Sequence, residues 1–262
     1  MQSDFIRRSA PHFGRIASIA LLTALAILLP AAIAPAAAIT YSGSGTFPGN
    51  GHTLSASATF DTLGNSLIVT LTNTGVADVL EQPEILCAVF YEVNGGLLGL
   101  TPGTGSAVLT SGSSVLFGGS DPGGVVGGEW AYMEGIGGVS PNGGRYGISS
   151  SGYGIFGSGS FPGTDLDPPG SVNGVNYGVT SSTDNPATGQ PAVTGSNPLI
   201  KNSVTFTIPG LPTGFDPMAS IGNVFFQYGT ALVPTDPGFS GSPEPATLSL
   251  LGLGLLAIRR RR

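Results

Sequence analysis

The stretch LSASATFDTLGNSLIVTLTN, residues 54–73, decides the fold, because its apolar and polar residues alternate on both sides of a short turn. One predicted strand face carries Leu54, Ala56, Ala58 and Phe60, and the next carries Leu67, Val69 and Leu71. A period of two is typical of half-buried strands, and Leu63-Gly64-Asn65 between them has turn chemistry. The stretch therefore predicts a β-hairpin with one buried face.

Other strand patterns follow along the chain, and no part of its body has a helical period. Alternation returns at residues 203–208. The runs at residues 85–93 and 224–228 are apolar on both faces and predict central strands. Shorter candidates are residues 107–109, 115–117 and 130–133.

Many short strands separated by Gly, Pro, Asn and Asp turns predict an all-β fold. We expect an antiparallel β-sandwich of jelly-roll or immunoglobulin-like type over residues 39–233. Residues 135–198 are rich in Gly, Ser and Asn, so we expect long loops there. GSGTFPG at residues 43–49 recurs as GSGSFPG at residues 157–163, which two similar turns explain better than a duplicated domain.

The composition and charge exclude some classes of partner. The chain has 43 Gly and 21 Pro, about a quarter of its residues, yet 40% hydrophobic residues can form a core. Residues 39–242 carry thirteen acidic side chains against Arg145 and Lys201, a formal charge of −11. Such a surface repels phosphate backbones, so we expect no nucleic-acid partner.

The one cysteine, Cys87, excludes an intrachain disulfide. Because it lies in the apolar run ILCAVFYEV, we interpret it as a small buried hydrophobic residue. A free reactive thiol or an intermolecular bridge is the alternative.

Residues 1–38 have the order of a secretory signal peptide: arginines, an apolar segment at residues 16–29, and then small residues. Ala36 and Ala38 form an A-x-A cleavage site, so the mature chain is expected to begin at Ile39. Export in the unfolded state is favoured over the twin-arginine route. A retained membrane anchor is the alternative.

The other end combines Pro243-Glu244-Pro245, an apolar run at residues 246–258 and the cluster Arg259, Arg260, Arg261 and Arg262. As a helix the run is about 20 Å long, which is short for a membrane span, so the arginines are expected to act as a membrane stop. Residues 234–242 are expected to form an extended linker to this tail.

These features of residues 243–262 resemble the PEP-CTERM sorting signal of Gram-negative bacteria. The resemblance implies processing by the membrane enzyme exosortase, transient tethering to the inner membrane, and delivery to the cell surface or extracellular matrix. It also implies a setting of exopolysaccharide and biofilm matrix. A plain C-terminal membrane anchor is the alternative.

Four stretches of residues 39–233 carry a second resemblance: DPGGVVGGEWAY (121–132), YGISSSGYGIFG (146–157), NPLIKNSVTFTIPGLP (197–212) and VFFQYGTAL (224–232). They resemble a group of exosortase-dependent surface proteins of the XDD type, which has no assigned enzymatic activity.

The sequence predicts no enzyme, no cofactor and no catalytic residues. His52 is the one histidine outside the signal peptide, and no G-x-S-x-G, HExxH, CxxC or Walker motif occurs. With one cysteine and one such histidine, a structural zinc site is excluded.

Carboxylates are the remaining candidates for chemistry. Asp165 and Asp167 lie two apart beside Pro and Gly, which suits an ordinary turn, a weak calcium site or a catalytic pair. Glu129 and Glu134 flank Trp130. We favour the turn interpretation.

Aromatic residues leave a binding role open. Trp130 and Tyr132 suit either core packing or a sugar-stacking platform, which Tyr146 and Tyr153 would extend. We therefore expect a non-enzymatic, structural or adhesive surface protein, with a carbohydrate-binding module as the alternative. A glycoside hydrolase and an ice-binding protein are weaker alternatives, since the threonine pairs at 70/72 and 205/207 make too small an array.

Overall fold

The computed structural model describes residues 37–103, 105–167, 174–233 and 235–244. These residues form strands in two sheets, with few and short helices, which confirms the all-β prediction. The jelly-roll and immunoglobulin-like types stay predictions.

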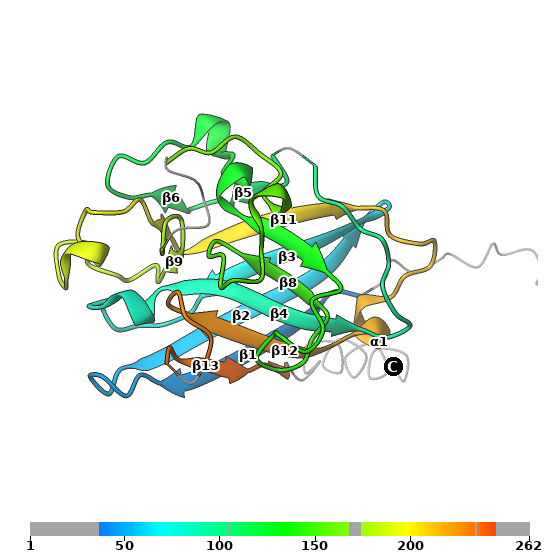
Figure 1. Cartoon of the computed structure of the whole chain (residues 1–262), viewed down its shortest axis with the longest axis horizontal. Helices are drawn as coiled ribbons and strands as arrows, with labels where there is room; N and C mark the ends of the chain where they lie inside the picture. The colour runs from blue at the N-terminus through cyan, green and yellow to red at the C-terminus, as the bar shows by residue number, and fades with distance from the viewer. Residues whose placement is uncertain (1–36, 104, 168–173, 234, 245–262) are drawn as a thin grey trace, which may run out of the picture. The chain divides into compact units, whose positions relative to one another are not determined.

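The first sheet has six strands, all antiparallel to their neighbours, in the order β14-β1-β2-β3-β11-β5 (Figure 1). Their bounds are β14 (Ser242–Pro243), β1 (Ile39–Thr46), β2 (Thr53–Leu63), β3 (Ser66–Asn73), β11 (Ser203–Pro209) and β5 (Ala107–Leu109). The predicted hairpin is confirmed as β2 and β3, which meet with Leu63 opposite Ser66.

The second sheet has eight strands and centres on β4 (Leu86–Val93). Its main path is β13 (Gly238–Ser240), β12 (Ile221–Tyr228), β4, β9 (Val179–Thr180), β10 (Ile200–Lys201) and β6 (Ser114–Val115). In addition, β8 (Tyr146–Ser149) pairs with β4, and β7 (Ala131–Glu134) pairs with β8. The pair of β9 and β10 is parallel. Strands β8 and β9 therefore lie within the segment for which the sequence predicts long loops.

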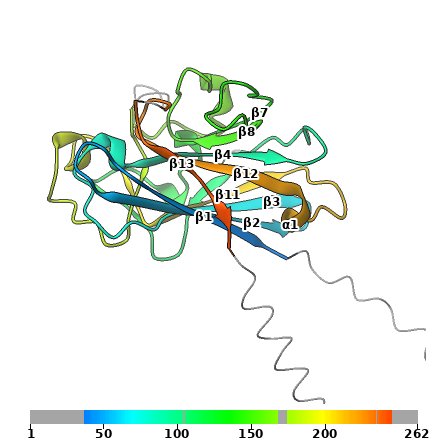
Figure 2. The ribbon, with the colours of Figure 1, turned by 90° about the horizontal axis from the view of Figure 1, so that it is seen from below.

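The main core lies between the two sheets (Figure 2). The inward side chains of β2 and β3 pack into the same cluster as Leu86, Val89 and Tyr91 of β4. Phe60, Leu67, Val69 and Leu71 are fully buried, as their alternation predicts. Burial of one such side chain contributes about 1.5–3 kcal/mol, so this alternation stabilises the first sheet.

Helices are minor in the described part of the chain. The one α-helix there, α1 (Pro217–Ser220), has a single turn whose N-cap Asp216 accepts a 3.0 Å hydrogen bond from the Met218 amide. In the described residues, no helix has the length and apolar character needed to cross a membrane. The signal-peptide helix and the membrane helix predicted at the two ends lie outside the described residues.

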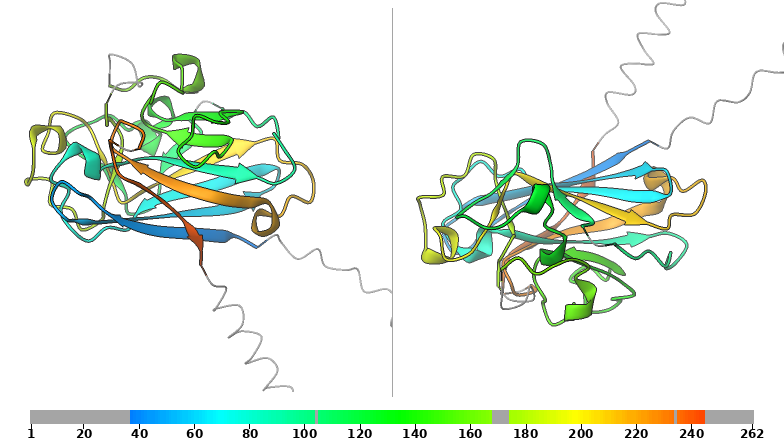
Figure 3. Two further views of the ribbon diagram at one scale, coloured as in Figure 1. Left: turned by 60° about the horizontal axis from the view of Figure 1, so that its bottom comes forward. Right: turned by 90° about the horizontal axis from the view of Figure 1, so that it is seen from above.

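The segment predicted as a linker, residues 234–242, contains β13 and the first residue of β14. Strand β13 pairs with β12 of the second sheet, and β14 pairs with β1 of the first. In Figure 3, the orange-red end of the chain runs beside the blue strand β1. We call residues 238–244 the C-terminal strap, because they connect the edges of both sheets.

Candidate functional site

The sorting motif begins inside the folded domain. Strand β14 places Ser242 opposite Ser42 and Pro243 opposite Tyr41. One residue further on, the Glu244 amide donates a 2.8 Å hydrogen bond to the Thr40 carbonyl, and the Ser42 hydroxyl donates to the Glu244 carboxylate. Pro243 and Glu244 are otherwise exposed. Pro245 and the arginines at 259–262 lie outside the described residues.

The predicted signal cleavage site lies at the same edge. Ala38 directly precedes β1, while Ala36 lies outside the described residues. Glu244 contacts Thr40. Ala38 and Glu244 therefore lie near each other, at the same edge of the first sheet.

The structure brings Asp165 and Asp167 together with Glu129, at the C-terminal end of the 3-10 turn η3 (Gly127–Glu129). Glu129 is 1% exposed, and its carboxylate accepts hydrogen bonds from the amides of Leu166 and Asp167, the latter at 3.3 Å. Burial raises the pKa of Glu129 to about 7; the two amides oppose this shift, and the nearby charge of Asp165 adds to it.

Asp165 and Asp167 accept hydrogen bonds from nearby groups, as the side chains of an ordinary turn do. The Asp167 amide donates to Asp165 Oδ1 at 3.2 Å, and Asn176 Nδ2 donates to Asp167 Oδ2 at 2.5 Å. Within the described ranges, no group of three or more His, Cys, Asp or Glu side chains is arranged to hold a metal ion. Glu134 serves a different loop, accepting a 3.2 Å bond from the Gly99 amide.

The aromatic candidates are buried or partly buried. The hypothesis of an exposed aromatic row that stacks on sugars is therefore wrong. Trp130 is 2% exposed, Tyr132 8% and Tyr146 0%. Trp130 packs edge-to-face on Phe206, with ring centroids 5.1 Å apart. Tyr153 is partly buried and donates its hydroxyl to the Gly229 carbonyl at 2.8 Å. Rings enclosed by protein on both faces are not available to stack on a sugar.

His52 and Cys87 lie in environments that suit a structural role. His52 Nδ1 lies 2.7 Å from Glu84 Oε1, and the other oxygen of this buried carboxylate accepts the amides of Leu80 and Glu81. Cys87 is fully buried and free, and burial raises the pKa of its thiol to about 12. A thiol that stays protonated is a poor nucleophile, which supports its interpretation as a small core residue.

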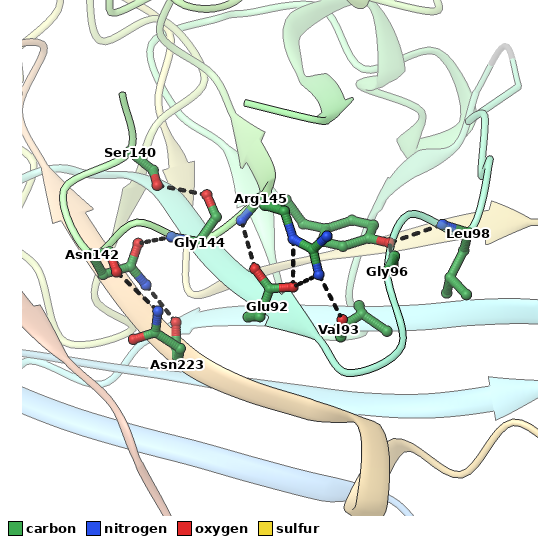
Figure 4. A network of polar contacts seen from close by, with 10 residues as sticks. Glu92, Val93, Gly96, Leu98, Ser140, Asn142, Gly144, Arg145 and Asn223 are labelled. Atoms are coloured by element: carbon green, nitrogen blue, oxygen red, sulfur yellow. Dashed lines mark hydrogen bonds and ion pairs between the residues drawn. The ribbon is translucent and has the colours of Figure 1, made fainter. Parts of the chain in front are cut away.

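Polar contacts hold the loop between β7 and β8 against β4 and β12 (Figure 4). Arg145 donates its backbone amide and its Nε to the two oxygens of Glu92, at 3.1 and 2.8 Å. These bonds hold the pKa of Glu92 below its usual value. Asn142 and Asn223 exchange side-chain-to-carbonyl bonds at an irregular point of β12. Arg145, one of the two Lys or Arg residues in residues 39–242, thus holds a loop in place.

Sequence reasoning missed the outward face of the first sheet. The register places Thr40, Thr59, Thr70 and Thr205 in one row across four strands, with Ser42, Ser57 and Thr72 in the next row. We call these seven residues the hydroxyl face. Thr40 bonds Thr59 at 2.8 Å, and Thr205 bonds Thr70 at 3.1 Å and Thr110 at 3.0 Å. Neighbouring rows and columns repeat at about 6.8 and 4.8 Å, the spacings of a regular sheet.

Comparison with known proteins adds one assignment. No curated protein and no solved structure matches this chain. Residues 243–262 match the family model of the PEP-CTERM protein-sorting motif, and the structure describes the first two residues of that match. The chain therefore carries at residues 243–262 a PEP-CTERM protein-sorting motif, which implies exosortase-dependent sorting of a surface protein.

Proposed function

We propose that this chain is a non-enzymatic protein of the cell surface or extracellular matrix. In this proposal it is exported, held at the inner membrane by its tail, processed by exosortase, and given a structural or adhesive role among exopolysaccharides. The observation that carries the proposal is the match of residues 243–262 to the sorting motif. Its support is the position of that motif beside the start of β1, where the predicted signal peptide ends.

The surroundings of the charged groups support a structural role. Glu84, Glu92 and Glu129 accept hydrogen bonds that hold loops in place. Lys201 donates to the Asp184 carbonyl at 2.8 Å. Groups committed to such contacts stabilise the domain, and an acidic surface suits a hydrated polymer matrix.

The test is the intact mass of the protein from surface and medium fractions of its host, with and without exosortase. The expected mass lacks residues 1–38 and the segment that follows the Pro-Glu-Pro motif, and exosortase deletion restores the tail. Added mass at the new C-terminus would identify an attached group. An intact tail in wild-type membranes would contradict the proposal and leave a plain anchored domain.

The hydroxyl face favours a second candidate function, binding of a neutral polysaccharide. None of the seven residues is charged, although the Glu244 carboxylate bonds Ser42 and Asp61 lies two residues beyond Thr59 on the same side of β2. The seven hydroxyls repeat in two directions, so they offer weak, regularly spaced hydrogen bonds to a polymer of sugar hydroxyls. This arrangement replaces the aromatic row as the basis of the carbohydrate-binding alternative. It also enlarges the threonine array beyond the two pairs visible in the sequence.

Substitution of lysine at the centre of the hydroxyl face tests the proposed polysaccharide binding. The double variant Thr70→Lys with Thr205→Lys is expected to lose retention on exopolysaccharide prepared from the host. Ser182→Lys, an exposed position in a loop outside the face, is the matched control and is expected to behave as wild type. Equal retention of all three proteins would exclude the face as the binding surface. Inhibition of ice growth by the wild type alone would instead assign the face to ice.

A further inference from the structure

The C-terminal strap is fastened to the domain by a ring that lies on two glycines. Phe239 covers the inner side of β1, where a Cβ added at Gly43 or Gly45 would come within 2.9 or 2.7 Å of its ring. On its other side the ring packs against Phe226 and Tyr228, with centroids 5.8 and 5.5 Å apart. The strap therefore fits only against a formed β1 that has no side chains at these two positions.

Beyond this ring, β1 holds the start of the sorting motif. Pro243 has no amide hydrogen to donate, so the Glu244 amide makes the backbone bond at this point, to Thr40. The Glu244 carboxylate accepts the Ser42 hydroxyl, a contact between residues 202 positions apart in sequence. Two of the groups by which an extended Glu244 can be recognised, its amide and its carboxylate, are thus engaged by the domain itself.

An enzyme that binds the motif in extended form competes with these contacts. Extended peptides are commonly bound through main-chain hydrogen bonds, with side-chain pockets adding specificity. The Glu244 amide donates one such bond at a time, and the Ser42 hydroxyl occupies one oxygen of the carboxylate. Release of Glu244 from β1 therefore precedes full engagement by the enzyme.

We infer that β1 acts as a latch on the sorting motif, with Ser42 as the residue that holds Glu244 until exosortase displaces it. The inference rests on the proposed processing by exosortase and adds a control to it. Because the strap packs on both β1 and β12, the latch forms only when the domain has folded. Folding then slows processing, and the open fraction of the strap sets the rate.

The rate of precursor conversion by exosortase-containing membranes tests the latch in the full chain. Ser42→Ala is expected to raise the initial rate about fivefold, since a hydrogen bond contributes about 0.5–1.5 kcal/mol net. Ser42→Thr keeps the hydroxyl and is expected to restore the wild-type rate. Ser44→Ala changes an exposed serine two residues along the same strand, opposite Ser55, and is the matched control. An unchanged rate for Ser42→Ala would overturn the latch, and a slower rate would show that β1 presents the motif instead.

Hydrogen exchange of the Glu244 amide tests the latch without exosortase. In the purified full chain this amide is expected to exchange at least tenfold more slowly than in the Gly43→Ala variant, whose Cβ would meet the Ser240 carbonyl at 2.7 Å and displace the strap. Equal exchange in a folded Gly43→Ala protein would overturn the latch, as would an unprotected amide in the wild type. A wild-type precursor that exosortase leaves uncut, with its Glu244 amide protected, would overturn the proposed function alone.

Discussion

Residues 39–73 and residues 94–199 both bury large side chains, but by different means. In the first region alternate residues of β2 up to Phe60 and of β3 enter the core, and most of their neighbours carry hydroxyls that face outward. In the second region the buried residues include polar and charged groups such as Glu129, Ser149 and Asp184. Backbone amides donate to several of these groups: the Val79 amide, for example, donates to Asp184 Oδ1 at 2.9 Å.

The comparison shows that the stability of the two regions depends on different changes. Apolar burial on a regular sheet depends on the area removed from water, so its loss is large and independent of pH. The stability of buried polar groups under loops depends on individual hydrogen bonds and close backbone contacts. One added methyl group or one proton can therefore change the free energy of unfolding. Four variants separate these effects.

The largest effect is expected from Phe60→Ala in the regular region. Phe60 is fully buried between Tyr41 and Tyr91, with ring centroids 6.1 and 5.0 Å away. Loss of the ring leaves a cavity and is expected to lower the free energy of unfolding by about 4 kcal/mol, measured by denaturant titration. Ser57→Ala, on the opposite face of the same strand, is the control. A loss under about 1 kcal/mol would show that this core is loosely packed.

Gly128→Ala is expected to cost about 3 kcal/mol in the loop region, because strain from overpacking falls in this range. An added Cβ would lie 1.6 Å from the Thr164 carbonyl, so the loop that carries Asp165 must move. Gly157→Ala, where a Cβ meets no atom within 4 Å, is the matched control. Equal stability of the two variants would show that the loop adjusts freely.

Glu129→Gln tests the response to a proton. The pKa of Glu129 is raised to about 7 in the folded state, so the folded protein binds more protons than the unfolded one between pH 5 and 7. Its stability therefore falls as pH rises through this range, by about 2 kcal/mol relative to Glu129→Gln. Denaturant titrations of both proteins at several pH values measure this difference. Parallel pH profiles would contradict the raised pKa.

Thr205→Val is expected to have the smallest effect, under about 1 kcal/mol, because cross-strand pairs on an open sheet face contribute little. The variant removes the bonds to Thr70 and Thr110 but keeps a β-branched side chain. Thermal unfolding at two scan rates gives the comparison with wild type. A loss as large as that of Gly128→Ala would mean that the hydroxyl face stabilises the sheet as strongly as the loop contacts do.

The sequence by itself determined the strands that alternate or are apolar throughout, the turn at Gly64, and the sorting motif. Each of these is a local pattern: a period of two, a turn dipeptide, or a motif followed by an apolar run and arginines. Such patterns need no knowledge of which segments become neighbours. For the same reason Glu129 and Asp165 were both recognised as candidates without any sign that they meet.

Only the tertiary structure decided which segments lie side by side. It paired β14 with β1, aligned the hydroxyls of four strands in rows, and enclosed Trp130 and Tyr132 in the core. The repeated GSG illustrates the point: at residues 43–45 its glycines lie under the Phe239 ring, whereas at residues 157–159 added Cβ atoms would meet open space. Register and long-range contact depend on how the whole chain closes its core, which no window of neighbouring residues contains.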